Sequence, residues 1–298
     1  MYKWRVAGRW GSTRYVRPMT RSEARQLQDW VVSERWDEGE HDADVLYDID
    51  PDGFWAILDD EGRLIGGVAA IAPDDEFGSA SMLYLTPEAR GQGMWQRTLT
   101  DLMTLIGHRL ATDISVTVFV FPDTVDATLP WGFVRLHDEV RMVRPPTLPG
   151  EFPLDEGVID ARDVSQADVI AFDAVHAGRP REALWRRWLD LPSSVTAAVI
   201  DDKRIVGLGT LRPSALGHRI GPLYATDPSV AERLMRRLLH DARGRRVAMD
   251  VPVGNPDAIS LANAFGFAED FRTVRMVRGP IPDVPWEQRY ATVMLHLD

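Results

Sequence analysis

The sequence of 298 residues contains no cysteine. This absence excludes disulfide bonds, thiolate metal sites, iron–sulfur clusters and a cysteine nucleophile. Only two lysines are present, Lys3 and Lys203, which disfavours catalysis through a lysine Schiff base. No stretch approaches the roughly 18 apolar residues that a membrane-spanning helix requires, and the first residues lack the apolar run of a signal peptide. We therefore expect a soluble, cytoplasmic protein without a membrane partner.

The charge balance is acidic, with 34 basic and 45 acidic side chains and a formal net charge of −11. Such a balance disfavours nucleic-acid binding, which usually requires a basic surface. The seven histidines show no spacing typical of metal ligands, so we expect no metal site. With 45% hydrophobic residues the chain can bury a full core, and its length suggests two domains at ~100–200 residues each.

Parts of the sequence recur in the same order. A Gly-Phe pair begins at Gly132 and again at Gly266, and a Val-Arg-Met-Val-Arg segment begins at Val140 and again at Val274. Both recur at an offset of 134 residues. An acidic turn followed by a glycine-containing apolar stretch also recurs, at residues 59–67 and 201–209. Matches that keep their order and nearly their spacing predict a duplicated unit.

A proline-rich stretch separates the two copies. Residues 144–153 hold four prolines, which cannot all lie inside a helix or a central strand. This composition is typical of a semi-rigid linker. We therefore place a first unit at residues 13–145 and a second unit at residues 156–298.

The two units show the same order of expected elements. In the first, apolar periodicity and turn residues predict strands at 14–17, 54–58, 64–72, 81–85, 115–121 and 133–143, and helices after Thr20, at 41–48 and at 93–108. In the second they predict a helix at 181–189, a hairpin around 201–203, strands at 220–224, 246–251 and 291–297, and helices after Asp227 and Asn255. We expect an α/β fold in which each unit is a mixed, mostly antiparallel sheet flanked by helices, the strand at 133–143 closing the first unit.

A glycine-rich turn between an expected strand and an expected helix carries the clearest chemical signal. The strand ends on Leu83, Tyr84 and Leu85, and the turn that follows contains Arg90, Gly91, Gln92, Gly93, Met94 and Trp95. Glycines let the backbone turn tightly, so that successive N–H groups point at one spot. The N-terminus of the following helix adds a partial positive charge. Such a turn is suited to a pyrophosphate.

This turn and the order of elements around it resemble the GNAT superfamily of acyl-CoA-dependent N-acetyltransferases. Arg90 and Gly93 match the family's phosphate loop, Arg/Gln-x-x-Gly-x-Gly/Ala, and the Pro-Glu pair at 87–88 and both late Gly-Phe pairs also fit the family. The second unit looks like the degenerate partner domain of tandem GNAT proteins. The resemblance therefore implies two tandem GNAT folds that span nearly the whole chain after residue 12.

The same resemblance implies an enzyme that moves an acetyl group from acetyl-CoA to a primary amine of a small molecule. In such folds the fourth strand separates from the fifth, and the pantetheine of coenzyme A lies in the gap. Leu83, Tyr84 and Leu85 would line that gap, and residues 90–95 would wrap the pyrophosphate. A backbone N–H would polarise the thioester carbonyl, as in an oxyanion hole.

Two departures from the family pattern leave alternatives open. Trp95 stands where the family has Gly or Ala, so its indole either packs inward beneath a working loop or fills the space of the cofactor. The family's usual acid, a tyrosine four residues before the late glycine, is replaced by Thr128 and Ala262. Tyr84 is then the candidate acid that reprotonates the thiolate, although a tyrosine in a strand is more often a packed core residue.

The candidate catalytic base comes from the acidic stretch between Glu34 and Asp44. Such a run is either a solvated face or a set of carboxylates crowded enough to raise a pKa. Asp42 is the leading candidate, because it falls on the aspartate of a GNAT subgroup that the segment 36–54 resembles. Glu76, expected at the end of a strand facing the cleft, is the alternative base.

The second unit has no glycine turn. Asp227 places a negative charge and Pro228 removes an N–H donor where a phosphate would bind, so we expect no second coenzyme site. Two other functions are compatible with the same fold. One is a catalytically inactive ligand-binding or regulatory protein, and the other is a CoA-dependent enzyme of different chemistry, such as decarboxylation or S-acyl transfer.

Overall fold

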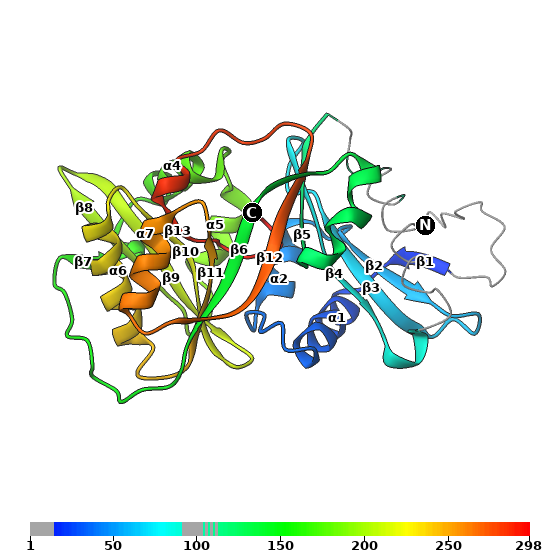
Figure 1. The fold of residues 1–298 in the computed structure, drawn as a ribbon, viewed down its shortest axis with the longest axis horizontal. Helices are drawn as coiled ribbons and strands as arrows, with labels where there is room; N and C mark the ends of the chain where they lie inside the picture. The colour runs from blue at the N-terminus through cyan, green and yellow to red at the C-terminus, as the bar shows by residue number, and fades with distance from the viewer. Residues whose placement is uncertain (1–14, 91–103, 105–106, 108–109, 111–112) are drawn as a thin grey trace.

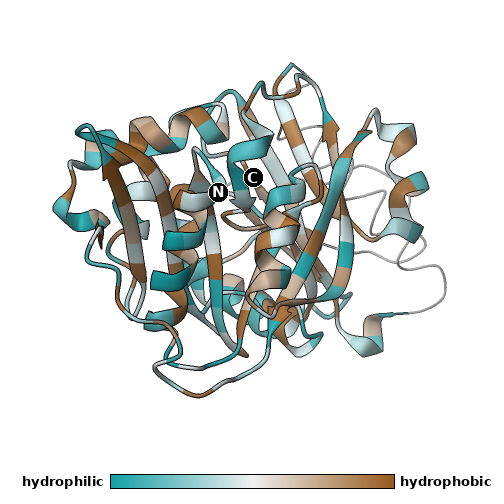
Figure 2. Ribbon diagram, turned by 60° about the vertical axis from the view of Figure 1, so that its left-hand side comes forward, coloured by the Kyte–Doolittle hydropathy of each residue, from teal (hydrophilic) through white to brown (hydrophobic). Residues whose placement is uncertain are grey.

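The structure is a computed structural model that describes residues 15–90, 104, 107, 110 and 113–298. The described residues form one mixed, mostly antiparallel 13-stranded sheet with helices packed on its faces (Figure 1). Apolar residues occur along the strands and on parts of the helices (Figure 2). The expected α/β class is thus confirmed, but the two sheets are joined into one. None of the helices in the described part of the chain is long and apolar enough to cross a membrane.

The described elements of the first unit are β1 (Tyr15–Pro18), α1 (Arg21–Ser33), α2 (Asp42–Ile49), β2 (Phe54–Leu58), β3 (Leu64–Ile71), β4 (Phe77–Leu85), β5 (Ser115–Val120) and β6 (Val134–Arg144). Local signals account for several of these boundaries. The Thr20 side chain accepts from the Glu23 amide and the Glu23 carboxylate accepts from the Thr20 amide, which is the capping box expected at the start of α1. The helix expected at 93–108 lies almost entirely outside the described residues.

The described elements of the second unit are β7 (Val158–Asp160), α4 (Gln166–Ala177), α5 (Glu182–Trp188), β8 (Val195–Asp201), β9 (Arg204–Ser214), β10 (Gly217–Ala225), α6 (Pro228–Asp241), β11 (Val247–Pro252), α7 (Pro256–Ala264), β12 (Ala268–Arg278) and β13 (Arg289–Ala291). The sequence did not predict α4. The strand expected at 291–297 is wrong, because β13 ends at Ala291.

The two units exchange equivalent strands at the centre of the sheet. The strand order there is β4-β5-β12-β6-β11-β10, and β6 and β12 run side by side in Figure 1. β6 follows β5 in the chain but pairs with β11 and β12, while β12 pairs with β5. β6 is the last strand of the first unit along the chain, but its neighbours in the sheet come from the second unit. The strand that lies beside β5 comes from the second unit.

Both faces of the joined sheet are covered. Apolar side chains of α6 and α7 pack with those of β10 and β11 in one core cluster. A second cluster combines residues of α1 and α2 with residues of α4 and α5 and with Val293, Met294 and Leu297 near the C-terminal end. This second core crosses the boundary between the units, and the C-terminal end lies at the centre of the molecule (Figure 1).

Candidate functional site

The strands β4 and β5 separate at the place where the resemblance expects a coenzyme. They pair in parallel from Phe77 and Ser115 to Ala80 and Val118, and their pairing stops there. β4 nevertheless continues to Leu85 and β5 to Val120. Two parallel strands that part in this way leave backbone groups on both inner edges free to bind an extended ligand.

A bulge in β4 lies at the start of this separation. Ser81 pairs with Ala69 and Tyr84 with Gly67, so two residues of β4, Met82 and Leu83, oppose one residue of β3. Met82 has a φ of +52°, a conformation that a residue with a long side chain rarely adopts. Such a bulge removes one residue from the ladder and redirects its backbone groups, and bulges of this kind are frequent beside active sites. The sequence carried no signal for it, because a methionine is an unusual residue at this φ.

Tyr84 of the predicted cofactor strand packs between α1 and Arg90. The Tyr84 ring stacks on Trp30 of α1 with centroids 5.3 Å apart, and the Arg90 guanidinium lies 5.0 Å from its centroid. Arg90 donates from Nε to the Leu85 carbonyl at 2.8 Å and from Nη2 to Glu34 at 2.6 Å. The structure therefore brings Tyr84, Leu85 and Arg90 together at the end of β4. Gly91, Gln92, Gly93, Met94 and Trp95 lie outside the described residues.

The equivalent gap in the second unit is filled by the chain itself. β10 and β11 pair in parallel only from His218 to Ile220 on β10. Beyond that point β13 pairs with the last part of β10, through Leu223 and Tyr224. The Thr292 amide then donates to the Asp250 carbonyl of β11 at 2.9 Å, so the C-terminal segment is bonded to both separating strands.

The N-terminal amides of α6, the helix that follows β10, are also unavailable to an anion. The Asp227 carboxylate accepts from the Ser229 and Val230 amides at 2.9 and 3.1 Å. These are the first-turn donors of α6 that would otherwise be free to bind a phosphate. The filled gap adds a second reason for expecting no coenzyme in the second unit.

Asp42, the leading candidate base, lies in a buried ion pair. Its carboxylate accepts from Arg212 of β9 through two bonds of 3.0 and 3.1 Å and from the Gly39 amide at 3.0 Å. Burial alone would raise the pKa of Asp42, but the charge and hydrogen bonds of Arg212 outweigh it and hold the pKa below its ordinary value. This placement speaks against the predicted base role and makes Asp42 a link between the two units.

The acidic stretch around Asp42 follows neither sequence-based interpretation. Asp37 pairs with Arg246, and Glu38 pairs with His296 at 2.9 Å. Both carboxylates are almost fully buried, as is Asp42. Asp37, Glu38 and Asp42 are thus neither a solvated face nor a crowded set of acids, because Arg246, His296 and Arg212 of the second unit bind them. Glu34 and Glu40 of the same stretch, by contrast, are exposed.

Glu76, the alternative base, lies at the other end of β4. It is an exposed residue just before the strand begins, and it lines a hollow of about 380 Å³ together with Arg179 and Arg181. Eight residues separate Glu76 from Tyr84 along an extended strand, which is about 26 Å at ~3.3 Å per residue. A base at this position could not reach a thioester held beside Tyr84, so this prediction is not supported by the geometry.

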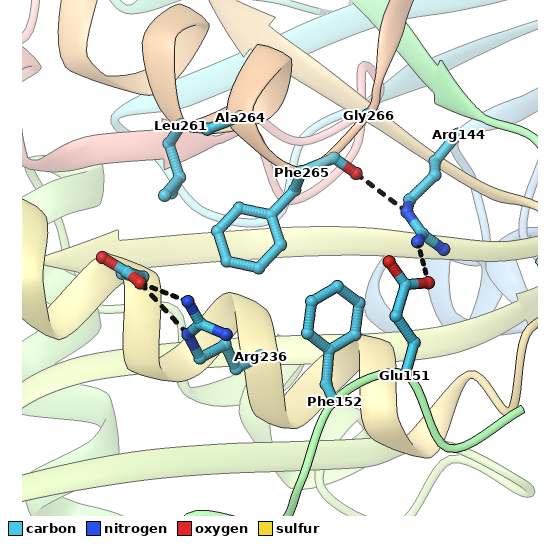
Figure 3. Close-up of a pocket in the computed structure, with 9 residues that line it drawn as sticks. Arg144, Glu151, Phe152, Arg236, Leu261, Ala264, Phe265 and Gly266 are labelled. Atoms are coloured by element: carbon cyan, nitrogen blue, oxygen red, sulfur yellow. Dashed lines mark hydrogen bonds and ion pairs between the residues drawn. The ribbon is translucent and has the colours of Figure 1, made fainter.

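A second hollow of about 380 Å³ lies in the second unit, where α6, the end of α7 and the linker meet (Figure 3). The rings of Phe152 and Phe265 face each other there at 5.4 Å, with the Arg236 guanidinium close to both. Arg144 binds Glu151 and the Phe265 carbonyl beside them. This hollow lies beside the linker and the end of α7, and it is therefore separate from the gap at the end of β4.

Replacing Asp42 by asparagine separates the two roles of this residue. We expect Asp42→Asn to destabilise the fold by about 3–5 kcal/mol, because Arg212 is left as an uncompensated buried charge. The folded protein should keep its turnover. Thermal and urea unfolding measure the first effect, and acyl transfer below the melting temperature measures the second. Asp44→Asn, on the same helix but part-exposed, is the control. Loss of turnover without loss of stability would instead restore Asp42 as the base.

Comparison with known proteins follows the division into two units. Residues 22–122 match the family described as Acetyltransferase (GNAT) family, and residues 169–291 match the family described as Acetyltransferase (GNAT) domain. A holothin acyltransferase from Pseudoalteromonas sp. (strain SANK 73390) is 28% identical over 268 residues, which cover 89% of this chain and 88% of that protein.

Solved structures show the same fold. A structure from Pyrococcus horikoshii described as a candidate acetyltransferase superposes with a TM-score of 0.79 at 14% identity and covers 100% of both chains. A tandem GNAT protein from the clavulanic acid biosynthesis pathway has a TM-score of 0.60 at 14% identity, covering 90% of this chain and 100% of that one. At these identities the likeness supports the fold alone.

Proposed function

Since the chain belongs to the GNAT acyltransferase family and carries two such domains in tandem, we propose that its first unit transfers an acetyl group from acetyl-CoA to a primary amine of a small molecule. The family and the enzyme class predicted from the sequence are confirmed. Membership implies an acyl-CoA cosubstrate. We therefore propose three further points: that the acyl group is acetyl, that the first unit binds the coenzyme, and that the acceptor is a primary amine.

The contrast between the two gaps supports the choice of unit. In the first unit β4 and β5 part beyond Ala80, and a bulge lies at the point of separation. In the second unit the same gap holds β13, and Pro222, which has no N–H, lies within the irregular part of β10. Among the described residues, the gap of the first unit therefore keeps backbone groups that an extended pantetheine could use, whereas the gap of the second unit is filled.

Different residues of the first unit would bind the coenzyme and assist the acyl transfer. Leu83, Tyr84 and Leu85 would bind pantetheine through their backbone, and the turn at 90–95 would hold the pyrophosphate. The bound thioester supplies the activated acyl group. Backbone N–H groups at the bulge are suited to stabilising the oxyanion that develops on its carbonyl. Tyr84 is the candidate for returning a proton to the leaving thiolate, and the incoming amine would lose its proton to water or to a base that the described residues do not yet identify.

A small-molecule acceptor is supported by the relative whose sequence aligns over most of both chains, since that protein is named for the acylation of holothin. We propose that the acceptor of the present chain is likewise an amine of a small molecule. The covered acidic stretch argues against a polycationic acceptor docking on it, because Asp37, Glu38 and Asp42 already have partners.

Calorimetric titration with acetyl-CoA tests the proposal. We expect one site per chain, lost in Gly93→Asp, because a carboxylate in the turn repels the pyrophosphate. Thr226→Asp places the same charge at the equivalent, exposed turn of the second unit and should leave binding unchanged. Tyr84→Phe should bind acetyl-CoA normally but release thiol more slowly with an amine. Two sites per chain, or binding that is indifferent to Gly93→Asp, would contradict the assignment to the first unit.

A further inference from the structure

The duplicated Val-Arg-Met-Val-Arg segment places two equivalent arginines at the centre of the sheet. Arg141 lies on β6 and Arg275 on β12. Each of these strands pairs antiparallel with a strand of the other unit, β6 with β11 and β12 with β5. Arg141 is the cross-strand partner of Asp250, and Arg275 is the cross-strand partner of Phe119. The duplication therefore supplies two equivalent arginines whose cross-strand neighbours differ: Asp250 and Phe271 beside Arg141, and Phe119 and His137 beside Arg275.

Arg141 has a buried carboxylate partner, Asp250, which it shares with Arg219. It donates to both carboxylate oxygens of Asp250, at 2.5 Å from Nε and 3.0 Å from Nη2. It also donates to the Trp36 carbonyl of the first unit. A buried arginine normally requires such a partner, because an unpaired charge in the interior is costly.

Arg275 is equally buried, with 2% of its surface exposed, but it has no such partner. Among the described residues, nothing accepts a hydrogen bond from its Nε or Nη1. Its guanidinium lies 5.7 Å from the Phe119 ring and 5.4 Å from the Trp286 ring. Burial lowers the pKa of Arg275 to about 10, so the group still carries its charge near neutral pH.

The acids near Arg275 are engaged elsewhere. Asp298 binds Arg289 at 2.5 Å and accepts from the Val293 amide. Glu139 accepts from the Thr292 hydroxyl at 3.1 Å and lies 3.0 Å from the ring nitrogen of His137. Neither carboxylate forms a hydrogen bond with Arg275, so the arginine retains unused donors.

The position of Arg275 relates it to the reaction site. Phe119 is the first residue of β5 beyond the paired part of β4 and β5, so Arg275 lies level with the start of the gap. Val274 and Met276 pack with Ala80 and Val118 on one face of the sheet, and the alternation of a strand therefore places Arg275 on the opposite face. The buried hydroxyls of Ser79 and Thr117 share that face by register, and neither has a hydrogen-bond partner in the described part of the chain.

We propose that Arg275 binds a carboxylate of a reactant held in the first unit, in the place that Asp250 takes beside Arg141. The inference rests on the proposed function and narrows its substrate class to an amine that also carries a carboxylate, or to an acyl group that does. A guanidinium binds a carboxylate through two parallel hydrogen bonds, and Arg275 offers unused donors in a site from which water is largely excluded.

Two matched arms of an acyl-transfer assay test the inference. In the first, amino acids and their amides accept an acetyl group from acetyl-CoA. In the second, a neutral amine receives either a succinyl or a butyryl group. We expect wild-type protein to favour the carboxylate-bearing reactant in one arm by about tenfold or more in kcat/KM, as expected for a charge-assisted hydrogen bond. Arg275→Met should abolish that preference, and Arg275→Lys should restore part of it.

Phe119 offers a second, independent variant. Phe119→Asp installs the carboxylate that the second unit has at Asp250, so it should also abolish the preference while Arg275 remains. Phe119→Asn, of the same size but uncharged, should keep it. An amino acid and its amide differ in basicity, but this difference is the same for every variant. A change in the ratio of their kcat/KM values therefore measures the contribution of Arg275.

Melting curves separate recognition from a structural role. Arg275→Met should melt no lower than wild type, because no ion pair is lost, whereas Arg141→Met should melt lower. A preference that is absent from both arms in wild-type protein, or that survives Arg275→Met, overturns the inference while leaving acetyl transfer intact. If no amine is acylated, the proposed function fails. Titration with N-acetylglycine and with its amide then decides the inference, because the acid must bind more tightly to wild type than to Arg275→Met.

Discussion

A fragment of residues 13–145 will not fold into a stable domain by itself. In the intact chain β12 lies beside β5, so the isolated fragment would lose a central strand. The core next to β5 would also lose Val274 and Met276, which come from the second unit. β6 would lose both of its neighbours. Circular dichroism and the dispersion of amide resonances should show an unfolded or aggregated fragment.

Mixing provides the control for this result. Fragments 13–145 and 156–298, expressed together, should recover the fold and a single cooperative melting transition, because each then supplies the strand that the other needs. A first fragment that melts cooperatively without its partner would show that the exchanged strands are not required. The unit boundaries would then be boundaries of independent folding as well as of duplication.

Asp250→Asn should cause a large loss of stability, about 3–5 kcal/mol in the free energy of unfolding. Asp250 is buried and binds both Arg141 and Arg219, so its neutralisation removes the carboxylate that two buried guanidinium groups share. Both arginines also hold carbonyls of the loop before α2, those of Trp36 and Asp37. Urea unfolding measures the effect. Glu182→Gln, which removes an exposed ion pair, should leave stability unchanged within error.

Acid should reproduce part of this loss in the wild-type protein. Burial would raise the pKa of Asp250, but the charges of Arg141 and Arg219 outweigh it and lower the pKa from 3.8 to about 2. Because the folded pKa lies below the unfolded one, the carboxylate stabilises the fold above about pH 4, and this contribution is lost as the pH falls toward 2. The asparagine variant should lose less stability than wild type over that range. Parallel curves for the two proteins would contradict the assignment.

Local sequence signals predicted the hairpins and the helix starts other than that of α4, because their physical causes lie within a few residues. Thr20 and Glu23 cap α1, and Asp227 caps α6, through bonds to amides two or three residues away. The duplication was equally visible, since its matches keep their order along the chain. The glycine turn after Tyr84 indicated the family for the same reason: its chemistry is contained in one short segment.

The candidate site depended more on contacts between distant residues. Nothing near Asp42 in the sequence shows that Arg212 binds it. The expected strand at 81–85 also did not show that an extended strand from Phe77 to Leu85 separates Glu76 from Tyr84. The bulge at Met82 has no local signal, because packing of the surrounding sheet holds a conformation that methionine alone disfavours. These residues could be placed only when the strands on both sides were known.

The sequence by itself determined the family, the two copies and the segments that begin helices and turns, because these depend on neighbouring residues. Tertiary structure decided that β12 lies beside β5 and β6 beside β11, and that the C-terminal segment fills the gap of the second unit. It also decided that Arg141 lies opposite the carboxylate of Asp250, whereas Arg275 lies opposite the ring of Phe119. The physical reason is that identical Val-Arg-Met-Val-Arg segments have identical local preferences. Only the free energy of packing the whole sheet distinguishes their partners.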